Sequence, residues 1–285
     1  ERVQAIYAQA SRDWGLFGLQ VGIRAEQATT TFDLLTTNEQ FDNDYRSLFP
    51  SAFVAFTPSE ATTIRGGYSR RIERPRRWAL NPFPSFDVTG SIIRQGNPAL
   101  RPEYTDSFEI RAQQITSFGS VALTPYYRRT TDIIRRIATP PNADGVSIRT
   151  PQNLDTADAW GAEAVVALDD VGGFNGFLSL EGFRLQTGTA PTSEAELSSD
   201  AFGWGGRLNA TYAFGDRFGL GGDLDLQATL RYSAPIDTEQ GRRGARANMN
   251  VALRQALFSD RAALTLQVRD PFDMTDLQIV LAQPE

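Results

Sequence analysis

The sequence contains no cysteine and no histidine. Without cysteine, disulfide bonds, thiolate metal sites and cysteine nucleophiles are excluded. Without histidine, the commonest general base and metal ligand is missing, so a Ser-His-Asp triad cannot form and a zinc site is not expected. We therefore expect no catalytic, metal-binding or cofactor-binding residues, and no enzyme activity.

Lysine is also absent, so arginine supplies all 28 basic residues against 34 acidic ones, and the net charge is -6. An acidic chain with scattered arginines is a poor nucleic-acid binder, and no nucleic-acid partner is expected. There is no run of 18 apolar residues, which excludes a transmembrane helix. A barrel strand needs apolar residues only at alternate positions, so a mean hydropathy of -0.33 is compatible with a membrane β-barrel.

Polar connections of two lengths alternate along the chain. Short turns are expected at 13–15, 57–60, 116–118, 169–173, 215–216 and 259–260, and long connections at 32–44, 72–102, 131–155, 187–200 and 233–244. The intervals between them hold alternating apolar and polar residues. Short turns at one rim and long loops at the other are typical of a transmembrane β-barrel.

Twelve strands are predicted, at 2–12, 16–31, 45–57, 61–72, 103–115, 119–131, 155–168, 174–187, 201–214, 217–232, 245–258 and 261–270. A thirteenth is expected to begin near Leu277. The segment 217–232 alternates most regularly, with Phe218 and Leu220 on its apolar face. In 174–187 the alternation is less clean, and we expect its aromatic residues to fill the lumen side. Most of these strands are longer than the ~5–6 residues of a globular strand, which favours a barrel over a sandwich.

Aromatic residues gather near both ends of the predicted strands, as expected at the two membrane interfaces. Near the short turns lie Trp14, Phe17, Phe118, Phe174, Phe214, Phe218 and Phe258, and toward the long loops lie Tyr126, Tyr127 and Tyr232. The loop 72–102 contains five prolines and is expected to be stiff and non-helical.

The first residues lack the features of a signal peptide, and 277–285 resemble a strand without the terminal aromatic that closes many barrels. We therefore expect residues 1–285 to be part of one outer-membrane β-barrel domain of a longer protein. The plug domain and the signal peptide are expected to lie outside this chain.

Several motifs carry a family resemblance. They are 22–26, 48–51, 68–75, 80–83, 95–103, 107–109 and 270–273, among which the string Gly96-Asn97-Pro98-Ala99-Leu100-Arg101-Pro102-Glu103 is the most specific. These segments resemble the outer-membrane β-barrel of TonB-dependent receptors, in the subgroup called the outer membrane protein β-barrel family. The string itself indicates a stiff loop that leads into a membrane strand.

The resemblance implies a 22-stranded barrel that encloses a plug, of which this chain supplies about 12–13 strands. It implies active uptake of a scarce ligand of the siderophore, cobalamin or oligosaccharide type, driven by the TonB energy-coupling system through the plug. The implied location is the outer membrane of a Gram-negative cell. The transported ligand is not indicated by the sequence.

Two charged groups are candidates for contacts. Arginines expected at the long-loop rim are Arg65, Arg70, Arg71, Arg74, Arg76, Arg77, Arg128, Arg129, Arg135, Arg136, Arg242, Arg243 and Arg246, and those near the short turns are Arg12, Arg217 and Arg261. They are either solvated loop charges or ligands for lipopolysaccharide phosphates or an anionic ligand. Glu163, Glu181, Asp223 and Asp225 are expected to face the lumen with Arg231, where they balance charges of the plug.

Two other function classes remain open on the sequence. One is a passive porin-like or structural outer-membrane barrel, which would lack a plug and a TonB box in the complete gene. The other is a soluble all-β enzyme, which the strand lengths, the absent histidine and the lipid-type alternation disfavour.

Overall fold

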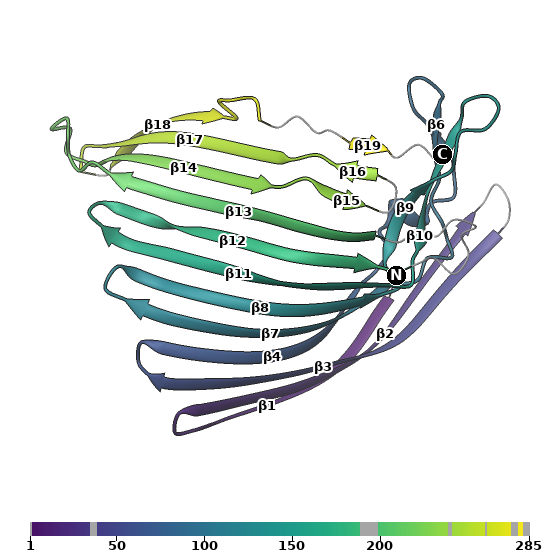
Figure 1. The fold of residues 1–285 in the computed structure, drawn as a ribbon, viewed down its shortest axis with the longest axis horizontal. Helices are drawn as coiled ribbons and strands as arrows, with labels where there is room; N and C mark the ends of the chain where they lie inside the picture. Colours follow the sequence, from purple (N-terminus) through teal and green to yellow (C-terminus); the bar gives the residue numbers. More distant parts are fainter. Residues whose placement is uncertain are drawn as a thin grey trace.

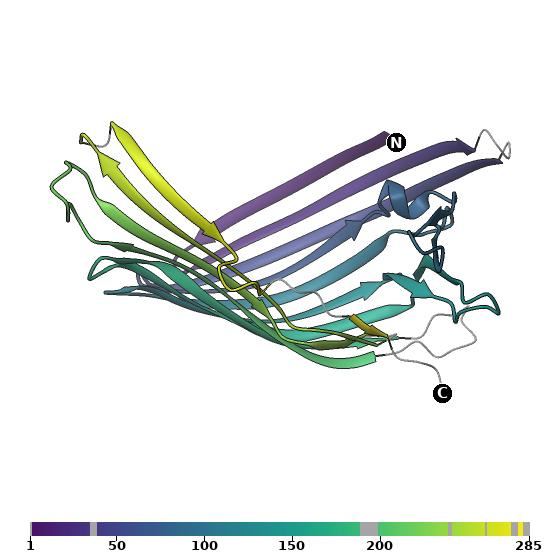
Figure 2. The same ribbon diagram turned by 90° about the horizontal axis from the view of Figure 1, so that it is seen from above.

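The computed structural model describes residues 2–34, 39–188, 199–238, 241–259, 261–274 and 279–281 of the 285-residue chain. Twelve strands form one antiparallel sheet, which we call the wall. They are β1 (Arg2–Trp14), β2 (Phe17–Leu34), β3 (Glu39–Ser59), β4 (Thr62–Glu73), β7 (Glu103–Thr116), β8 (Gly119–Thr131), β11 (Thr156–Val171), β12 (Phe174–Thr187), β13 (Ser199–Ala213), β14 (Leu224–Ser233), β17 (Arg246–Leu257) and β18 (Ala262–Arg269). Figure 1 shows them stacked in chain order, and Figure 2 shows that the wall is curved.

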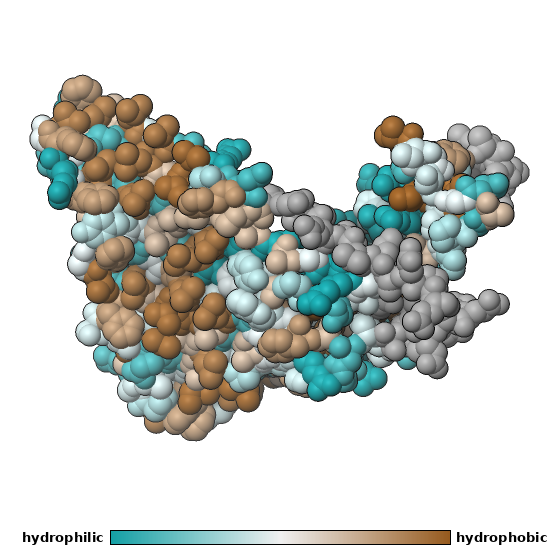
Figure 3. All heavy atoms as spheres, turned by 45° about the horizontal axis from the view of Figure 1, so that its top comes forward, coloured by the Kyte–Doolittle hydropathy of each residue, from teal (hydrophilic) through white to brown (hydrophobic). Residues whose placement is uncertain are grey.

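Alternation along each strand gives the wall one apolar and one polar face. Leu226 and Leu230 of β14 pair with Leu253 and Met249 of β17, so the apolar face continues across strands. Its side chains are exposed in the isolated chain, as for Leu264, which is 69% exposed. Figure 3 shows apolar residues gathered over the short-turn part of the wall and hydrophilic ones toward the long loops. We call the apolar face the lipid face and the polar one the lumen face.

The predicted twelve wall strands are confirmed, but β14 begins at Leu224 rather than at residue 217. Gly219 and Gly221 have φ angles of +65° and +70°, which a regular β-ladder does not accommodate. The Asp216 carboxylate accepts hydrogen bonds from the backbone N–H groups of Leu220 and Gly221, at 2.9 and 3.2 Å. The predicted tight turn at 215–216 is therefore also wrong, because a longer capped loop connects β13 to β14.

The predicted long connection at 32–44 is largely strand. β2 and β3 continue as a paired ribbon until Leu34 lies opposite Glu39. The predicted thirteenth wall strand is corrected as well, because β19 (Ile279–Leu281) pairs with β16 (Gly241–Arg243) in a small sheet with β15 (Ile236–Thr238). Leu277, the turn residue Asp260 and most of the predicted loop 187–200 lie outside the described residues.

The loops at the long-loop end, which we call the outer end, carry a second layer that we call the roof. It consists of α1 (Arg77–Leu80), β5 (Ser85–Phe86), β6 (Ile92–Arg94), β9 (Ile134–Ala138) and β10 (Ser147–Asn153). The four strands form one sheet in the order β5-β6-β10-β9, with β6 and β10 parallel. The expectation of a non-helical loop at 72–102 is wrong at α1, a single turn held by contacts from the rest of the roof. No helix among the described residues is long and apolar enough to cross a membrane.

Aromatic residues form two interfacial groups, as predicted. Near the short turns, Phe17 stacks on Phe56 with ring centroids 4.9 Å apart. Toward the outer end, Tyr68, Phe108 and Tyr127 follow one another on the lipid face, with ring centroids 4.8 and 6.2 Å apart. Tyr126 is an exception, because it lies on the lumen face and is buried.

Candidate functional site: the roof and the lumen face

The Gly-Asn-Pro string fastens α1 to the rest of the roof. The N–H of Gly96 donates to the Asn81 carbonyl at 2.8 Å, and the N–H of Asn97 donates to the Ala79 carbonyl at 2.6 Å. The Asn97 side chain accepts the N–H of Ala99 at 3.0 Å and donates to the Pro151 carbonyl at 3.3 Å. A Cβ at position 96 would lie 2.4 Å from the Asn81 carbonyl oxygen. Glycine is required here because two backbone segments approach closely.

Gly96→Ala is therefore expected to loosen the roof by about 1–3 kcal/mol, the usual cost of forcing extra atoms into a packed site. The measurement is the rate of trypsin cleavage at Arg77 and Arg94, both exposed roof residues. Gly66→Ala is the matched control, because a Cβ there meets no atom within 4 Å. Equal cleavage rates in both variants would contradict the proposed close approach.

A second set of contacts, hydrogen bonds and an ion pair, joins the 95–103 string to loop 132–155, which contains β9 and β10. The Asn153 side chain accepts the N–H of Arg101 at 2.9 Å and donates to the carbonyls of Arg101 and Asp132, at 3.0 and 2.6 Å. The Arg101 guanidinium is 2.5 Å from the Asp132 carboxylate. Glu103 accepts the N–H of Ile134. The string is thus a clasp between loop 74–102 and loop 132–155.

The largest fully buried side chains lie where these loops meet the wall. They are Leu100, Ile133 and Leu154, each 1% exposed. Ile133 and Leu154 pack with Ala157, and Leu185 of β12 lies against the same cluster. Because this small core joins loop and wall residues, the roof has a fixed position above the wall.

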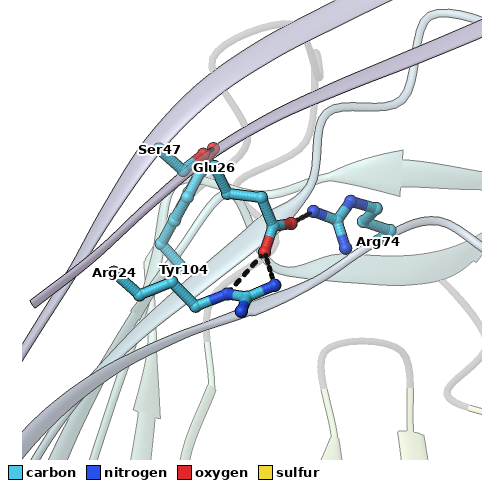
Figure 4. A network of polar contacts seen from close by, with 5 residues as sticks. All are labelled: Arg24, Glu26, Ser47, Arg74 and Tyr104. Atoms are coloured by element: carbon cyan, nitrogen blue, oxygen red, sulfur yellow. Dashed lines mark hydrogen bonds and ion pairs between the residues drawn. The ribbon is translucent and has the colours of Figure 1, made fainter. Parts of the chain in front are cut away.

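One carboxylate ties the β2–β3 ribbon to the roof. Glu26, at the outer part of β2, accepts a hydrogen bond from Arg24 at 2.9 Å and forms an ion pair with Arg74, which follows β4 (Figure 4). Its side chain is 7% exposed. Nearby, Ser47 of β3 and Tyr104 of β7 share a hydrogen bond of 2.7 Å. These contacts span strands that are not neighbours in the wall.

The exposed surface of the roof offers cationic and aromatic groups. The Arg136 guanidinium lies 4.2 Å from the centroid of the half-exposed Trp78 ring. At the turn before β6, the Asp87 carboxylate accepts the N–H of Ile92 and the hydroxyl of Thr89, and these bonds hold the pKa of Asp87 below its usual value. Such a surface suits an anionic or aromatic ligand.

The lumen face carries acidic and basic groups side by side. Glu163 and Glu181 lie directly opposite each other on β11 and β12, where Ser179 and Tyr126 donate to them at 2.6 and 2.5 Å. Asp225 pairs with Arg254 at 3.2 Å. The predicted lumen position of Glu163, Glu181, Asp225 and Arg231 is confirmed. Asp223, by contrast, lies in the connection before β14.

The residue opposite Arg231 carries the same positive charge. Arg231 lies directly opposite Arg207, and Asn248 follows in the same row on β17. Like charges directly opposite each other destabilise a sheet. Among the described residues neither arginine forms an ion pair. The carboxylates elsewhere on the lumen face already bind other side chains. This pair could not be foreseen from sequence, because strand register decides which residues meet.

The predicted rim arginines do not form one surface. Arg65 lies near the start of β4 beside the short turns, opposite Arg111, so its predicted outer position is wrong. Arg70 and Arg129 lie on the lipid face, in register with Asp106 between them. Their chain neighbours Arg71 and Arg128 lie on the lumen face, where Arg128 covers the Tyr126 ring at 4.0 Å.

Sequence and structure comparisons place this wall among known proteins. A profile of the outer membrane protein beta-barrel family matches residues 1–281. The chain belongs to this family. As a member of the outer membrane protein beta-barrel family it lies in the outer membrane, so the predicted family, fold class and location are confirmed.

Proteins similar to this family member were found both by sequence and by structure. The iron-regulated outer membrane virulence protein of Vibrio cholerae is 30% identical over 136 residues, which are 45% of this chain and 21% of that protein. The FrpB iron transporter from Neisseria meningitidis superposes with a TM-score of 0.64 at 15% identity, over 98% of this chain and 42% of that one. The ferric yersiniabactin uptake receptor FyuA from Yersinia pestis gives 0.62 at 14%, over 95% and 40%. The chain spans less than half the length of these structures.

Proposed function

We propose that this chain forms part of the barrel of a TonB-dependent receptor that actively imports a scarce ligand. The observation that supports this most is the roof, which the 95–103 clasp holds at the outer end of a lipid-facing wall. A fixed surface outside the membrane suits capture of a ligand, whereas a porin needs an open mouth. The proposed role is binding and transport, without catalysis.

The ligand belongs to the siderophore, cobalamin or oligosaccharide type, and the iron-related relatives favour a ferric siderophore. Arg136 and Trp78 on the roof suit the anionic and aromatic groups of such a ligand. We further propose that residues 1–285 are part of one barrel domain, which surrounds a plug coupled to TonB. Carboxylates of that plug would balance Arg207 and Arg231 on the lumen face.

The test uses the full-length gene in a strain that lacks its own siderophore receptors, grown under iron limitation. We expect growth on at least one ferric siderophore from a panel, and loss of that growth when TonB is deleted. Uptake that persists without TonB would instead indicate the passive barrel.

A further inference from the structure

Two polar and aromatic rows cross the lipid face at the outer end of six neighbouring strands. The charged row contains Arg70, Asp106, Arg129, Asp158, Gln186 and Asp200, each in register with the next. The aromatic row lies two residues closer to the short turns and contains Tyr68, Phe108, Tyr127, Trp160, Arg184 and Phe202. Both rows lie on the face that continues inward as Leu123, Ala164 and Leu180.

The order of these rows fixes their depth in the membrane. Aromatic girdles lie at the interface between hydrocarbon and headgroups, and an arginine on the lipid face costs little free energy only near that interface. The charged row lies one step beyond the aromatic row, about 6–7 Å further along the strands. Its charges are therefore at the level of the lipid headgroups.

Two tyrosines of the aromatic row donate hydrogen bonds to two carboxylates of the charged row. Tyr68 donates to Asp106 at 2.8 Å, and Tyr127 donates to Asp158 at 2.5 Å. Arg70 and Arg129 flank Asp106 in register, yet among the described residues no ion pair joins either of them to it. The Arg70 guanidinium lies over the Tyr104 ring, 5.3 Å from its centroid, and Arg129 hydrogen-bonds with Tyr127. Neither contact neutralises the arginine, so both positive charges remain available to an anionic partner outside the protein.

Arg70 and Arg129 lie on β4 and β8, on either side of β7. Two strand spacings separate them, which is about 9–10 Å. Guanidinium groups bind phosphate with paired hydrogen bonds. At the outer end of the wall the surrounding leaflet consists of lipopolysaccharide, a phosphorylated glycolipid.

We propose that Arg70 and Arg129 form a binding site for the phosphate groups of lipopolysaccharide on the lipid face. Tyr68 and Tyr127 keep the neighbouring carboxylates of Asp106 and Asp158 hydrogen-bonded, so that these do not form ion pairs with the arginines. The site depends on the outer-membrane location of the wall and is independent of which ligand is imported.

The neighbouring arginines provide a matched control. Arg71 and Arg128 differ from Arg70 and Arg129 by one position in the chain, but they lie on the lumen face. The full-length protein is purified from outer membranes as R70Q/R129Q and as R71Q/R128Q, which have the same net charge. Heat-modifiable electrophoretic mobility and circular dichroism establish that both fold.

Purified lipopolysaccharide is then titrated into each delipidated protein. We expect R70Q/R129Q to bind it at least about tenfold more weakly than the wild type, because two charge-assisted contacts are lost. R71Q/R128Q should bind it with unchanged affinity. Equal affinities in the two variants would overturn the proposal. Equally strong binding of phosphatidylglycerol by the wild type would also overturn it, since the site would then recognise any anionic lipid.

Discussion

Ala228→Arg is expected to destabilise the folded barrel by about 2–4 kcal/mol, whereas Gln227→Arg should change its stability by less than about 1 kcal/mol. The two residues are adjacent on β14 and point to opposite faces. Ala228 lies in register with Ala210 and Val251 on the lipid face, and Gln227 lies with Thr211 on the lumen face.

The two substitutions are expected to differ because lipid surrounds residue 228, whereas water surrounds residue 227. Position 228 is about midway between the two aromatic groups of the lipid face, where a guanidinium must be withdrawn from water. At position 227 the same group remains hydrated and lies two residues from Asp225. The measurement is urea or guanidinium unfolding of the full-length protein in lipid vesicles. Equal losses of stability would show that hydrocarbon does not cover the face that contains Ala228.

Leu100→Ala is expected to lower the free energy of opening the roof by about 2–5 kcal/mol, the range for truncation of a fully buried leucine. Leu100 is 1% exposed within the clasp, so truncation of its side chain leaves a buried cavity. Hydrogen exchange of the backbone amides of Gly96 and Asn97, which donate to Asn81 and Ala79, reports this opening.

The matched control for Leu100→Ala is Leu220→Ala. Leu220 lies in the exposed connection before β14 and is 46% exposed, so its truncation should leave exchange in the roof unchanged. If Leu100→Ala also left the exchange rates of Gly96 and Asn97 unchanged, packing beneath the clasp would not be what holds the roof. The roof would then owe its position to hydrogen bonds alone.

The wall was predictable from sequence because its cause is local. A period of two residues decides which side chains face lipid, and the strand intervals followed from it. The same period gave a wrong prediction at Phe218 and Leu220. Apolar and polar residues still alternate there, but Gly219 and Gly221 have positive φ angles and are not extended. Glycine permits that departure without any change in the hydropathy pattern.

The roof was less predictable because its bonds join distant residues. The string at 96–103 predicted a stiff loop, but nothing in it indicates that Asn97 donates to Pro151 or that Asn153 accepts from Arg101. The turn of α1 follows Pro75 and depends on the Asn97 N–H that donates to Ala79. The arginines were predicted as one group, yet alternation along β4 places Arg70 on the lipid face and Arg71 on the lumen face.

The contact of Glu26 with both Arg24 and Arg74 has a mechanical consequence. The paired β2–β3 ribbon extends outward beyond the rest of the wall (Figure 2). Because one carboxylate connects this ribbon to the chain that enters the roof, a force on the ribbon is transmitted to the roof. A force applied only to the ribbon would thereby shift the roof without any contact with it.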